Sequence, residues 1–395
     1  MAKLGECFSV IRNGASIRQT DGAGGFPITR IETIADKTIN REKFGYAGIY
    51  DLAQYRDYIL QDGDILMSHI NSEKHLGKVA LYSKQDDEQI IHGMNLLMLR
   101  ADTQKVIPEY AKYYFESQKF LRQIGRITKK SVNQASFTVT ALKGLEIPLA
   151  SIIVQRDISE KLKKVDWLVS LRKQQLAKLD ELVKARFVEM FGDPQSNSKG
   201  WPLDTLNNII STIESGWSGN GKQREKTPDE IAVLKVSSVT KGYFIPTECK
   251  VLDDQSNIKK YVFPQKGDIL FSRANTKEMV GATALITQDY PDLILPDKLW
   301  KIRFAENINV FYMKSILSSK SIRDRFSAES TGTSGSMYNV SMEKFRAITV
   351  PIPPFSLQNE FAVFVECVDQ QKQTVQQSLE KLELMKKALM QEYFG

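Results

Sequence analysis

The sequence contains few cysteines and histidines. Histidine occurs three times in 395 residues, without the spacing of metal ligands, and the cysteines are Cys7, Cys249 and Cys367. An odd number of distant cysteines without a CxxC pair argues against disulfides and zinc, and favours a reducing compartment. We therefore expect a cytoplasmic protein without a metal site, and little scope for histidine catalysis.

Long apolar runs and nucleotide-binding motifs are also missing. No stretch is apolar over the length of a bilayer, and MAKLGECFSV has no signal-peptide pattern. No GxxxxGK[ST] occurs, and the Gly-rich DGAGGF (21–26) neither follows a clear strand nor opens a helix. These absences exclude a membrane span and predict no cofactor in this chain.

The charge balance is positive. The formal net charge is +7 and the pI is about 9.0, with 42% hydrophobic and 26% charged residues. Such a composition is ordinary for a globular protein that can build sizeable cores. The sign of the charge favours an anionic partner, and both nucleic acid and a membrane surface fit that sign.

One short phrase occurs twice. The chain reads DILMSHIN at 64–71 and DILFSRAN at 268–275, and Gly63 and Gly267 precede the two copies at a shift of 204. Gly77 and Gly281 keep that shift, and IPLASIIVQ (147–155) aligns with VPIPPFSLQ (350–358) at a shift of 203. An ordered series at nearly constant offset predicts two copies of one unit of about 200 residues.

The first part of each copy mixes strands with one helical stretch. Short β-like runs such as DILMSH, KVALYS and LLMLR have counterparts in ILFSR, TALIT and LWKIRF. One helix is expected over 109–124 in the first copy and one over 309–326 in the second.

The last part of each copy predicts a long helix. Apolar residues there follow steps of three and four, which is typical of a coiled-coil-like seam that needs a partner. A proline segment precedes each helix, and Gly192 and Pro194 end the first one. The residues expected to pair the two helices are Ile158, Leu162, Val165, Leu176, Leu179, Val183, Phe361, Val365, Val368, Leu379, Leu382 and Leu389.

The predicted fold class is α+β with an internal pseudo-two-fold repeat. Mixed α/β domains at 1–150 and 193–353 alternate with helices at 151–192 and 354–395. A parallel helix pair would need the linker to run back along the helices, so the antiparallel arrangement is preferred. Two related basic domains held at a fixed distance suit two half-sites on duplex DNA. Because the two copies have diverged, they should recognise different base sequences.

The sequence resembles the specificity subunits of type I restriction–modification systems over nearly its whole length. The resemblance rests on the duplication, on GDILMS and GDILFS, and on the junctions LKGLEIPLASIIVQRDISEKLKKVD (142–166) and FRAITVPIPPFSLQNEFAVFVECVD (345–369). The terminal VKARFVEMFGD and MKKALMQEYFG complete it, whereas Leu149-Ala150 departs from the second proline pair that is frequent in the family.

The resemblance implies a non-catalytic subunit. Each domain would be a target recognition domain that reads half of an asymmetric site on double-stranded DNA. The helices would set the gap and dock two methyltransferase subunits, and restriction/translocase subunits would complete the complex. S-adenosylmethionine, ATP and Mg²⁺ are then expected on those partners.

Residues for reading DNA are sought in polar loops at equivalent places in the copies, because paired donors and acceptors distinguish bases. In each copy, one such loop follows the strand of the repeated phrase and a second loop precedes the helical junction. A third loop is rich in glycine and carries basic residues. The alternative for each is a solvated turn or hairpin tip. The candidates are Arg12, Arg18, His69, Asn71, Lys74, Lys129, Lys130, Ser131, Asn133, Gln134, Trp217, Lys222, Arg224, Arg273, Asn275, Lys277, Thr331, Thr333, Ser334, Tyr338 and Asn339.

Catalytic interpretations find little support. Pro228-Asp229 with Glu248-Cys249-Lys250 fits a permissive nuclease outline, but the first copy lacks it. In IPPF (352–355) an isoleucine replaces the polar residue of the similar methyltransferase loop. No catalytic residue is predicted, and the alternative that stays open is a two-headed scaffold that binds proteins rather than DNA.

Overall fold

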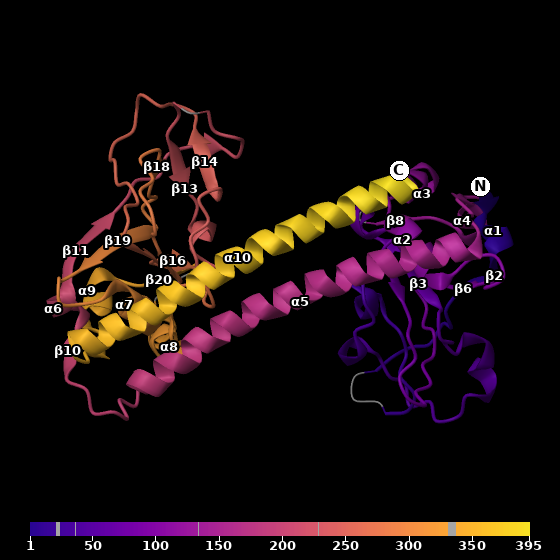
Figure 1. The fold of residues 1–395 in the computed structure, drawn as a ribbon, viewed down its shortest axis with the longest axis horizontal. Coiled ribbons are helices and arrows are strands. Elements are labelled where there is room, and N and C mark those ends of the chain that lie inside the picture. Colours follow the sequence, from indigo (N-terminus) through magenta and orange to yellow (C-terminus); the bar gives the residue numbers. More distant parts are fainter. Residues whose placement is uncertain (21–23, 36, 133, 228, 331–336) are drawn as a thin grey trace. The chain divides into compact units, whose positions relative to one another are not determined.

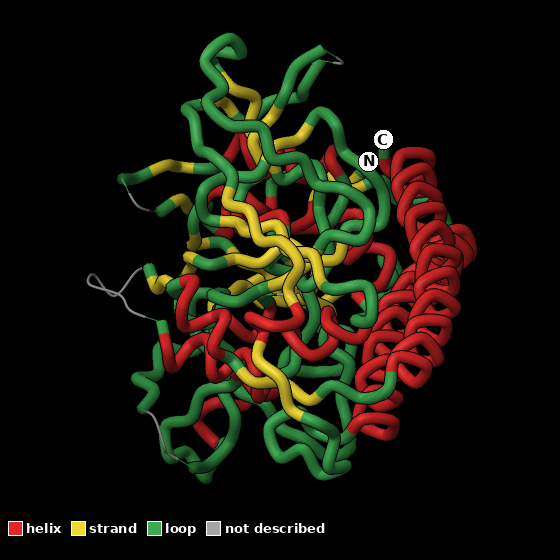
Figure 2. Tube along the Cα trace, turned by 90° about the vertical axis from the view of Figure 1, so that its left-hand side faces the viewer, coloured by secondary structure: helices red, strands yellow, loops and turns green. Residues whose placement is uncertain are grey.

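The computed structural model describes residues 1–20, 24–35, 37–132, 134–227, 229–330 and 337–395. Two compact units divide the chain, one formed by Met1–Lys173 with Gln377–Gly395 and the other by Gln174–Gln376. Each unit therefore holds one globular body and parts of both long helices, α5 (Ile152–Phe191) and α10 (Phe355–Phe394). These helices are the longest in the chain (Figures 1 and 2).

The described part of the body of unit 1 contains short strands, short α-helices and four 3₁₀ turns (Figure 1). The strands are β1 (Ala2–Lys3), β2 (Phe8–Asn13), β3 (Ile65–Ser68), β4 (Ile70–Asn71), β5 (Val79–Leu81), β6 (Leu96–Ala101), β7 (Lys129–Lys130), β8 (Ala135–Ser136) and β9 (Glu146–Ile147). The helices are α1 (Leu4–Cys7), α2 (Pro108–Phe115), α3 (Gln118–Ile127) and α4 (Val139–Lys143), with η1 (Ile31–Ile34), η2 (Arg41–Lys43), η3 (Ala53–Tyr58) and η4 (Glu73–His75).

The body of unit 2 follows the same plan. Its strands are β10 (Leu203–Thr205), β11 (Ile210–Ser215), β12 (Gly221–Lys222), β13 (Ala232–Leu234), β14 (Cys249–Leu252), β15 (Ile269–Ser272), β16 (Ala274–Asn275), β17 (Thr283–Leu285), β18 (Leu293–Ile294), β19 (Leu299–Phe304), β20 (Tyr338–Asn339) and β21 (Thr349–Pro351). Its helices are α6 (Leu206–Ile209), α7 (Val310–Ser318), α8 (Lys320–Glu329) and α9 (Met342–Ala347), with η5 (Val236–Ser238).

The sheet topology confirms the duplication. The central antiparallel sheet has the strand order β2-β6-β3-β5 in unit 1 and β11-β19-β15-β17 in unit 2, which are equivalent strands. The copies differ outside that sheet, since only unit 2 adds the four-stranded sheet β12-β14-β13-β18 among the described residues. Mixed strands and helices in two related bodies confirm the predicted fold class.

The repeated phrase builds the same turn in both copies. Gly63 and Gly267 have φ of +84° and +88°, which favours glycine. The following carboxylates, Asp64 and Asp268, accept the backbone N–H of Gln61 and Gln265 at 2.7 Å. Each buried carboxylate also pairs with an arginine of the neighbouring strand, at 2.7 Å for Arg100–Asp64 and 2.6 Å for Arg303–Asp268.

Each predicted single helix is in fact two. The stretch 109–124 divides into α2 and α3 at Ser117, and 309–326 divides into α7 and α8 at Ser319. Both serines are N-caps, and their side chains accept from Phe120 N at 3.2 Å and Ile322 N at 3.4 Å. The expectation of one helix per copy is wrong, because a serine cap starts a new helix there.

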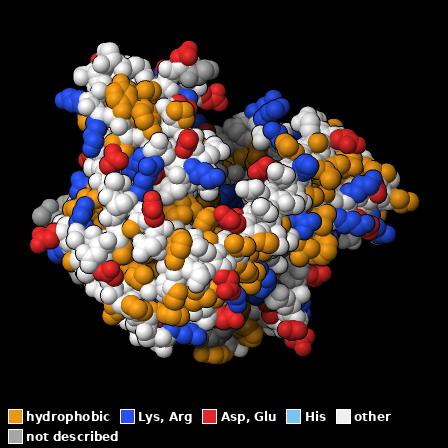
Figure 3. Space-filling view, turned by 60° about the vertical axis from the view of Figure 1, so that its left-hand side comes forward, with side chains coloured by type: hydrophobic (Ala, Val, Ile, Leu, Met, Phe, Trp, Pro, Cys, Tyr) orange, Lys and Arg blue, Asp and Glu red, His pale blue; other side chains and the backbone are white. Residues whose placement is uncertain are grey.

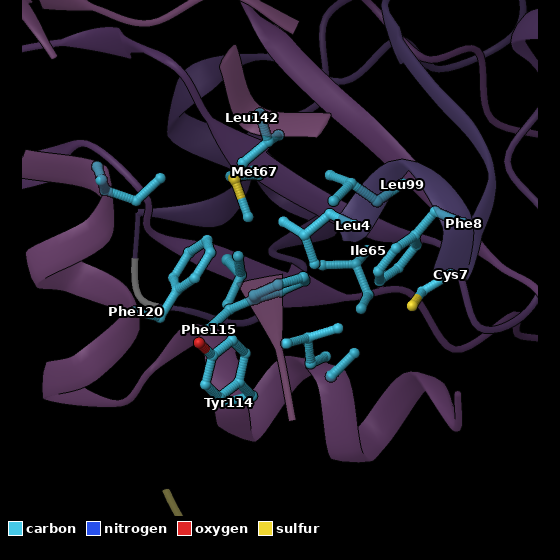
Figure 4. Packing of buried hydrophobic residues seen from close by; sticks show 14 of the residues in the cluster. Leu4, Cys7, Phe8, Ile65, Met67, Leu99, Tyr114, Phe115, Phe120 and Leu142 are labelled. Carbon is cyan, nitrogen blue, oxygen red and sulfur yellow. The ribbon is translucent and has the colours of Figure 1, made fainter. Parts of the chain in front are cut away.

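The core of each body includes residues of the long helices. In unit 1, Leu4, Ile65 and Phe115 point into one apolar core, shown in Figure 4, which also contains Leu162 of α5 and Phe394 of α10. In unit 2, Phe191 of α5 and Phe361 of α10 occupy the equivalent core. The helices are therefore built into the bodies rather than attached to them.

The predicted pairing seam is mostly buried. Leu176, Leu179, Val183, Val368 and Phe364 form one cluster within unit 2. Ion pairs in each unit show the antiparallel direction, since Asp166 meets Lys386 at 2.5 Å and Arg186 meets Glu360 at 3.0 Å. Ile158, Leu162 and Leu389 pack into the core of body 1, and Phe361 and Val365 into that of body 2, so these five do more than pair the helices. Val165 and Leu379 are also buried, and Leu382 is half-buried.

The buried Asp268 cluster gives a stability prediction. Asp268 is fully buried against Arg303 and against Lys301, whose side chain is 7% exposed. Asp268→Ala would leave buried positive charge uncompensated, and we expect it to lower the free energy of unfolding by about 3–5 kcal/mol. Chemical denaturation measures this. The control Asp324→Ala removes an exposed helical pair with Lys320 and should cost less than about 1 kcal/mol; equal losses would contradict the prediction.

Candidate nucleic-acid interface

The first two predicted loops meet in unit 1. The last two residues of the repeated phrase form β4, which pairs with β8, and β8 pairs with β7. Lys129 and Lys130 on β7 are exposed, as are Ser131 and Gln134 in the hairpin that follows. A small three-stranded sheet thus carries exposed basic and amide side chains on and beside β7.

Contacts within this hairpin hold its shape. Ser131 Oγ donates to the Gln134 carbonyl at 2.8 Å, and Lys130 pairs with Glu73 at 2.8 Å between two largely exposed side chains. Such a surface pair adds little stability and is easily exchanged for a phosphate. Lys74, on η4, is also exposed, so the hairpin and η4 together offer several cations to a polyanion.

The equivalent loops also meet in unit 2. β16 pairs with β20, and Asn275 lies opposite Tyr338 and Ala274 opposite Asn339. Arg273 precedes β16, and its Nε donates to the Asp297 carbonyl at 2.9 Å, which leaves the rest of its guanidinium available. Lys277 follows β16 and is exposed. The same place in the fold therefore carries different side chains in the two units.

Two asparagines have a structural role that the repeat explains. Asn71 Oδ1 accepts from Ser72 N at 2.8 Å, and Asn275 Oδ1 accepts from Thr276 N at 2.9 Å. Both amides lie 3.4 Å from the serine hydroxyl at the end of the preceding strand. Their oxygens build the turn in each copy, so a base contact would have to come from the amide N–H₂ group.

His69 is not on an accessible surface, contrary to the prediction. Its side chain is buried, its ring lies edge-on to Phe137, and burial lowers its pKa to about 4. An uncharged ring inside the body cannot reach a DNA base. The signal was available, because the position continues an apolar strand, whereas its counterpart Arg273 is half-buried with a long side chain.

The third pair of loops is less uniform. Arg12 stacks over Tyr58 at 4.1 Å and bonds the Asp57 carbonyl, whereas Arg18 is exposed. In unit 2, Lys222 is exposed and Trp217 packs partly against an apolar cluster, which limits its use for stacking on bases.

Arg224 has an internal partner. It binds Glu230 through two N–H groups, and this hydrogen bonding, above all, lowers the pKa of Glu230 to about 2. The charge of Arg224 is therefore neutralised within the loop, so Lys222 is the better candidate in this loop to bind a phosphate.

Some predicted residues cannot be placed. Asn133, Thr331, Thr333 and Ser334 lie outside the described residues.

Three exposed tyrosines were not among the residues that the sequence predicted to contact DNA. Tyr50 is 75% exposed, Tyr243 is 58% exposed and Tyr261 is 51% exposed. A tyrosine in a loop rich in glycine or lysine, as in KGYF, was the available signal. Rings in such positions can stack on exposed bases.

Charge alone does not mark the interface. On the face shown in Figure 3, lysines and arginines are interspersed with acidic and neutral side chains. Among the described residues no group of three histidine, cysteine, aspartate or glutamate side chains is arranged to hold a metal ion. The described helices include none with the length and apolarity that a bilayer crossing requires.

Comparisons with known proteins agree with this arrangement. The family model for the type I restriction modification DNA specificity domain matches residues 1–181 and 211–384. The chain is 38% identical over 223 residues to the putative type I restriction enzyme MjaX specificity subunit of Methanocaldococcus jannaschii, covering 56% of this chain and 52% of that protein. It is 26% identical over 235 residues to the EcoEI specificity subunit of Escherichia coli, covering 56% and 39%.

The match thus spans about half the length of these curated relatives or less. A solved structure, the S subunit of a type I restriction–modification system from M. genitalium, shares the fold over 100% of this chain and 95% of that one, with a TM-score of 0.57 and 15% identity. Since the family model matches both copies of the repeat, the chain belongs to the family of type I restriction–modification DNA specificity domains.

Proposed function

We propose that this chain is the non-catalytic, DNA-reading subunit of a type I restriction–modification complex, and that each body reads one half of an asymmetric bipartite site on double-stranded DNA. The observation that carries the proposal is the equivalent pair of loops, β4–β8–β7 and β16–β20, on one duplicated scaffold with different side chains. Equivalent central sheets place the loops alike, and different side chains select different bases.

The chemistry of the loops supports this division of labour. The exposed lysines 74, 129, 222 and 277 suit phosphates, while Gln134 and the free N–H groups of Arg273 suit base edges. We assign the chemical steps of hydrolysis and methyl transfer to partner subunits. S-adenosylmethionine, ATP and Mg²⁺ would be bound by those subunits.

Exposed apolar side chains on the long helices support protein partners. Trp167 is 61% exposed and Leu384 is 67% exposed in unit 1, and Val363 is 67% exposed and Val188 is 55% exposed in unit 2. Apolar groups on helices that already have a pairing seam are typical of a second interface. We assign them to two methyltransferase subunits, with restriction subunits joining the full complex.

The test is a map of methylated adenines. The chain is expressed with the methyltransferase subunit encoded beside it, in a host without such systems, and the host DNA is sequenced for modified adenine. An asymmetric two-part motif with a fixed gap, absent when this chain is omitted, is the expected result. A pair that co-purifies without any motif would favour the protein-binding scaffold instead.

Two residues of the hairpin of unit 1 allow base recognition and phosphate binding to be tested separately. Gln134→Ala should weaken binding to the cognate duplex by about 1–3 kcal/mol and relax one half-site only. Lys129→Ala should weaken binding to all duplexes and reduce the salt slope by about one. Fluorescence anisotropy over a salt series, on cognate and scrambled duplexes, measures both. Identical behaviour of the two variants would argue against this assignment.

The helices should act as the ruler between half-sites. One heptad inserted into each helix, within the paired segments after Lys173 and before Gln377, keeps the seam in register. Seven residues add about 10 Å at about 1.5 Å each. The unread gap should grow by about three base pairs, given about 3.4 Å per pair. The methylation map measures the gap, and an unchanged gap would remove the helices from that role.

A further inference from the structure

Unit 2 contains a cleft beside its long helices. Its volume is about 1480 Å³, and it is lined by α5, α10, α7, α8 and the loops around Lys241 and Lys277. Apolar side chains such as Val183, Phe187, Phe311 and Val365 form part of its walls. Among the described residues that were predicted to read DNA, only Lys277 lines it, and the exposed Tyr243 lines it too, so the cleft shares few residues with the proposed DNA-reading surface.

The equivalent place in unit 1 is occupied by an ion-pair network. Lys112 on α2 pairs with Glu116 at 3.3 Å and lies 3.9 Å from Asp166 on α5. Asp166 also pairs with Lys386 on α10 at 2.5 Å and accepts from Tyr113 Oη at 3.0 Å. Two lysines and two carboxylates thus balance one another between the body and the helices.

The duplication identifies the counterparts in unit 2. Tyr110 and Tyr312 donate to the equivalent carbonyls of Pro148 and Pro351, so α2 and α7 superpose in register. On that register Lys314 corresponds to Lys112, and Ser318 replaces Glu116. Likewise Asp369 corresponds to Asp166, and Val183 stands in the place of Lys386.

Lys314 has consequently lost its carboxylate. Its Nζ donates to Ser318 Oγ at 2.6 Å, and among the described residues no carboxylate forms an ion pair with it. Asp369 is engaged by Lys372 at 3.3 Å, and Asp180 on α5 by the same lysine at 2.7 Å. Burial, with Arg323 and Lys372 nearby, lowers the pKa of Lys314 to about 8, against the opposing effect of Asp369 and Asp180.

Other cations face the same cleft. Lys184, Lys241 and Lys277 line it without a salt bridge among the described residues, whereas Lys320 pairs with Asp324. Arg323 donates to the carbonyl of Glu278 at 2.6 Å and not to a carboxylate. The described lining holds seven lysine and arginine side chains and five carboxylates, so the cleft has two more positive than negative groups beside its apolar walls.

We propose that this cleft receives an acidic, partly apolar segment of the methyltransferase partner, with one of its carboxylates on Lys314. The proposal rests on the proposed function and adds the location and chemistry of one docking site. A carboxylate there would restore the pair that unit 1 supplies internally, and apolar side chains would cover Phe187 and Phe311. A DNA backbone would satisfy the cations but leave those apolar walls uncovered, so a protein segment is favoured.

The two units would then differ in partner binding. Unit 1 already neutralises its lysine, so the site on Lys314 is specific to unit 2. A partner segment that carries aspartate or glutamate among apolar residues therefore fits unit 2, where Ser318 stands in the place of Glu116, and does not fit unit 1. This asymmetry would distinguish the two methyltransferase subunits.

The experiment titrates the full chain with the methyltransferase subunit encoded beside it, using calorimetry, and titrates a cognate DNA duplex in parallel. Lys314→Met removes the cation, and Ser318→Glu installs the acid that unit 1 has. Both should weaken the partner affinity of one of the two sites by roughly 30-fold or more. Lys320→Met is the matched control, because that lysine lies on the same cleft with its side chain 89% exposed and already paired.

A pH series adds a signature that misfolding would not give. A bound carboxylate raises the pKa of Lys314, so docking takes up a proton wherever the free lysine is neutral. Partner affinity of the native chain should therefore be level below about pH 8 and fall as the pH rises above it. In Lys314→Met this fall should disappear, while the thermal unfolding curve shows that the variant is folded.

Each remaining outcome overturns the docking site. If DNA affinity falls and partner affinity does not, the cleft binds nucleic acid; if neither falls, Lys314 has no ligand of this kind. A native chain that gives no methylation motif would instead remove the proposed function itself. The methylation map of the native complex is recorded first, so the two failures are told apart.

Discussion

A buried glutamine fastens each long helix to its own body, and the rest of the structure depends on this joint. Gln155 and Gln358 are fully buried, and their Oε1 atoms accept from Ile107 N and Asn309 N at 2.9 Å. Their amide groups donate to carbonyls before the helix, at Ala150 and Pro353, also at 2.9 Å. A buried amide left unpaired would be costly, so the helix can start in only one orientation on its body.

The far ends of the helices repeat this logic with aromatic packing. Phe394 lies 5.2 Å from Tyr110 in unit 1, and Phe191 lies 4.8 Å from Tyr312 in unit 2, measured between ring centroids. Both rings are buried, so the end of each helix contributes to a core. Each long helix therefore contributes buried groups to a core at both of its ends.

Comparison of the two copies distinguishes the structural features that they share from the positions at which their side chains differ. The turn glycines, the buried Asp–Arg pairs and the strand order are shared, whereas the residues that follow β3 and β15 differ, His69 in one copy and Arg273 in the other. Where the fold sets a side chain deep, as at His69, the position serves packing; where it leaves the side chain at the rim, as at Arg273, recognition chemistry is available. The units also diverge around Lys112 and Lys314, where one places an acid and the other opens a cleft.

The sequence by itself determined the duplication, the fold class and the two long helices, because a constant offset and a three-to-four periodicity are properties of the chain. It also indicated the turns that present polar loops. It missed the division of each predicted helix at Ser117 and Ser319, since a serine caps a helix only where its own backbone is extended, as it is at both positions.

Only the tertiary structure decided which of these loops come together and which of their side chains stay accessible. Strand pairing put β4 beside β8 and β16 beside β20, buried His69 and tied Arg224 to Glu230. Burial and partner choice are set by residues far apart in the chain, such as Ser318 and Asp369 around Lys314. No local pattern carries that information, because it arises only when the helices pack against the bodies.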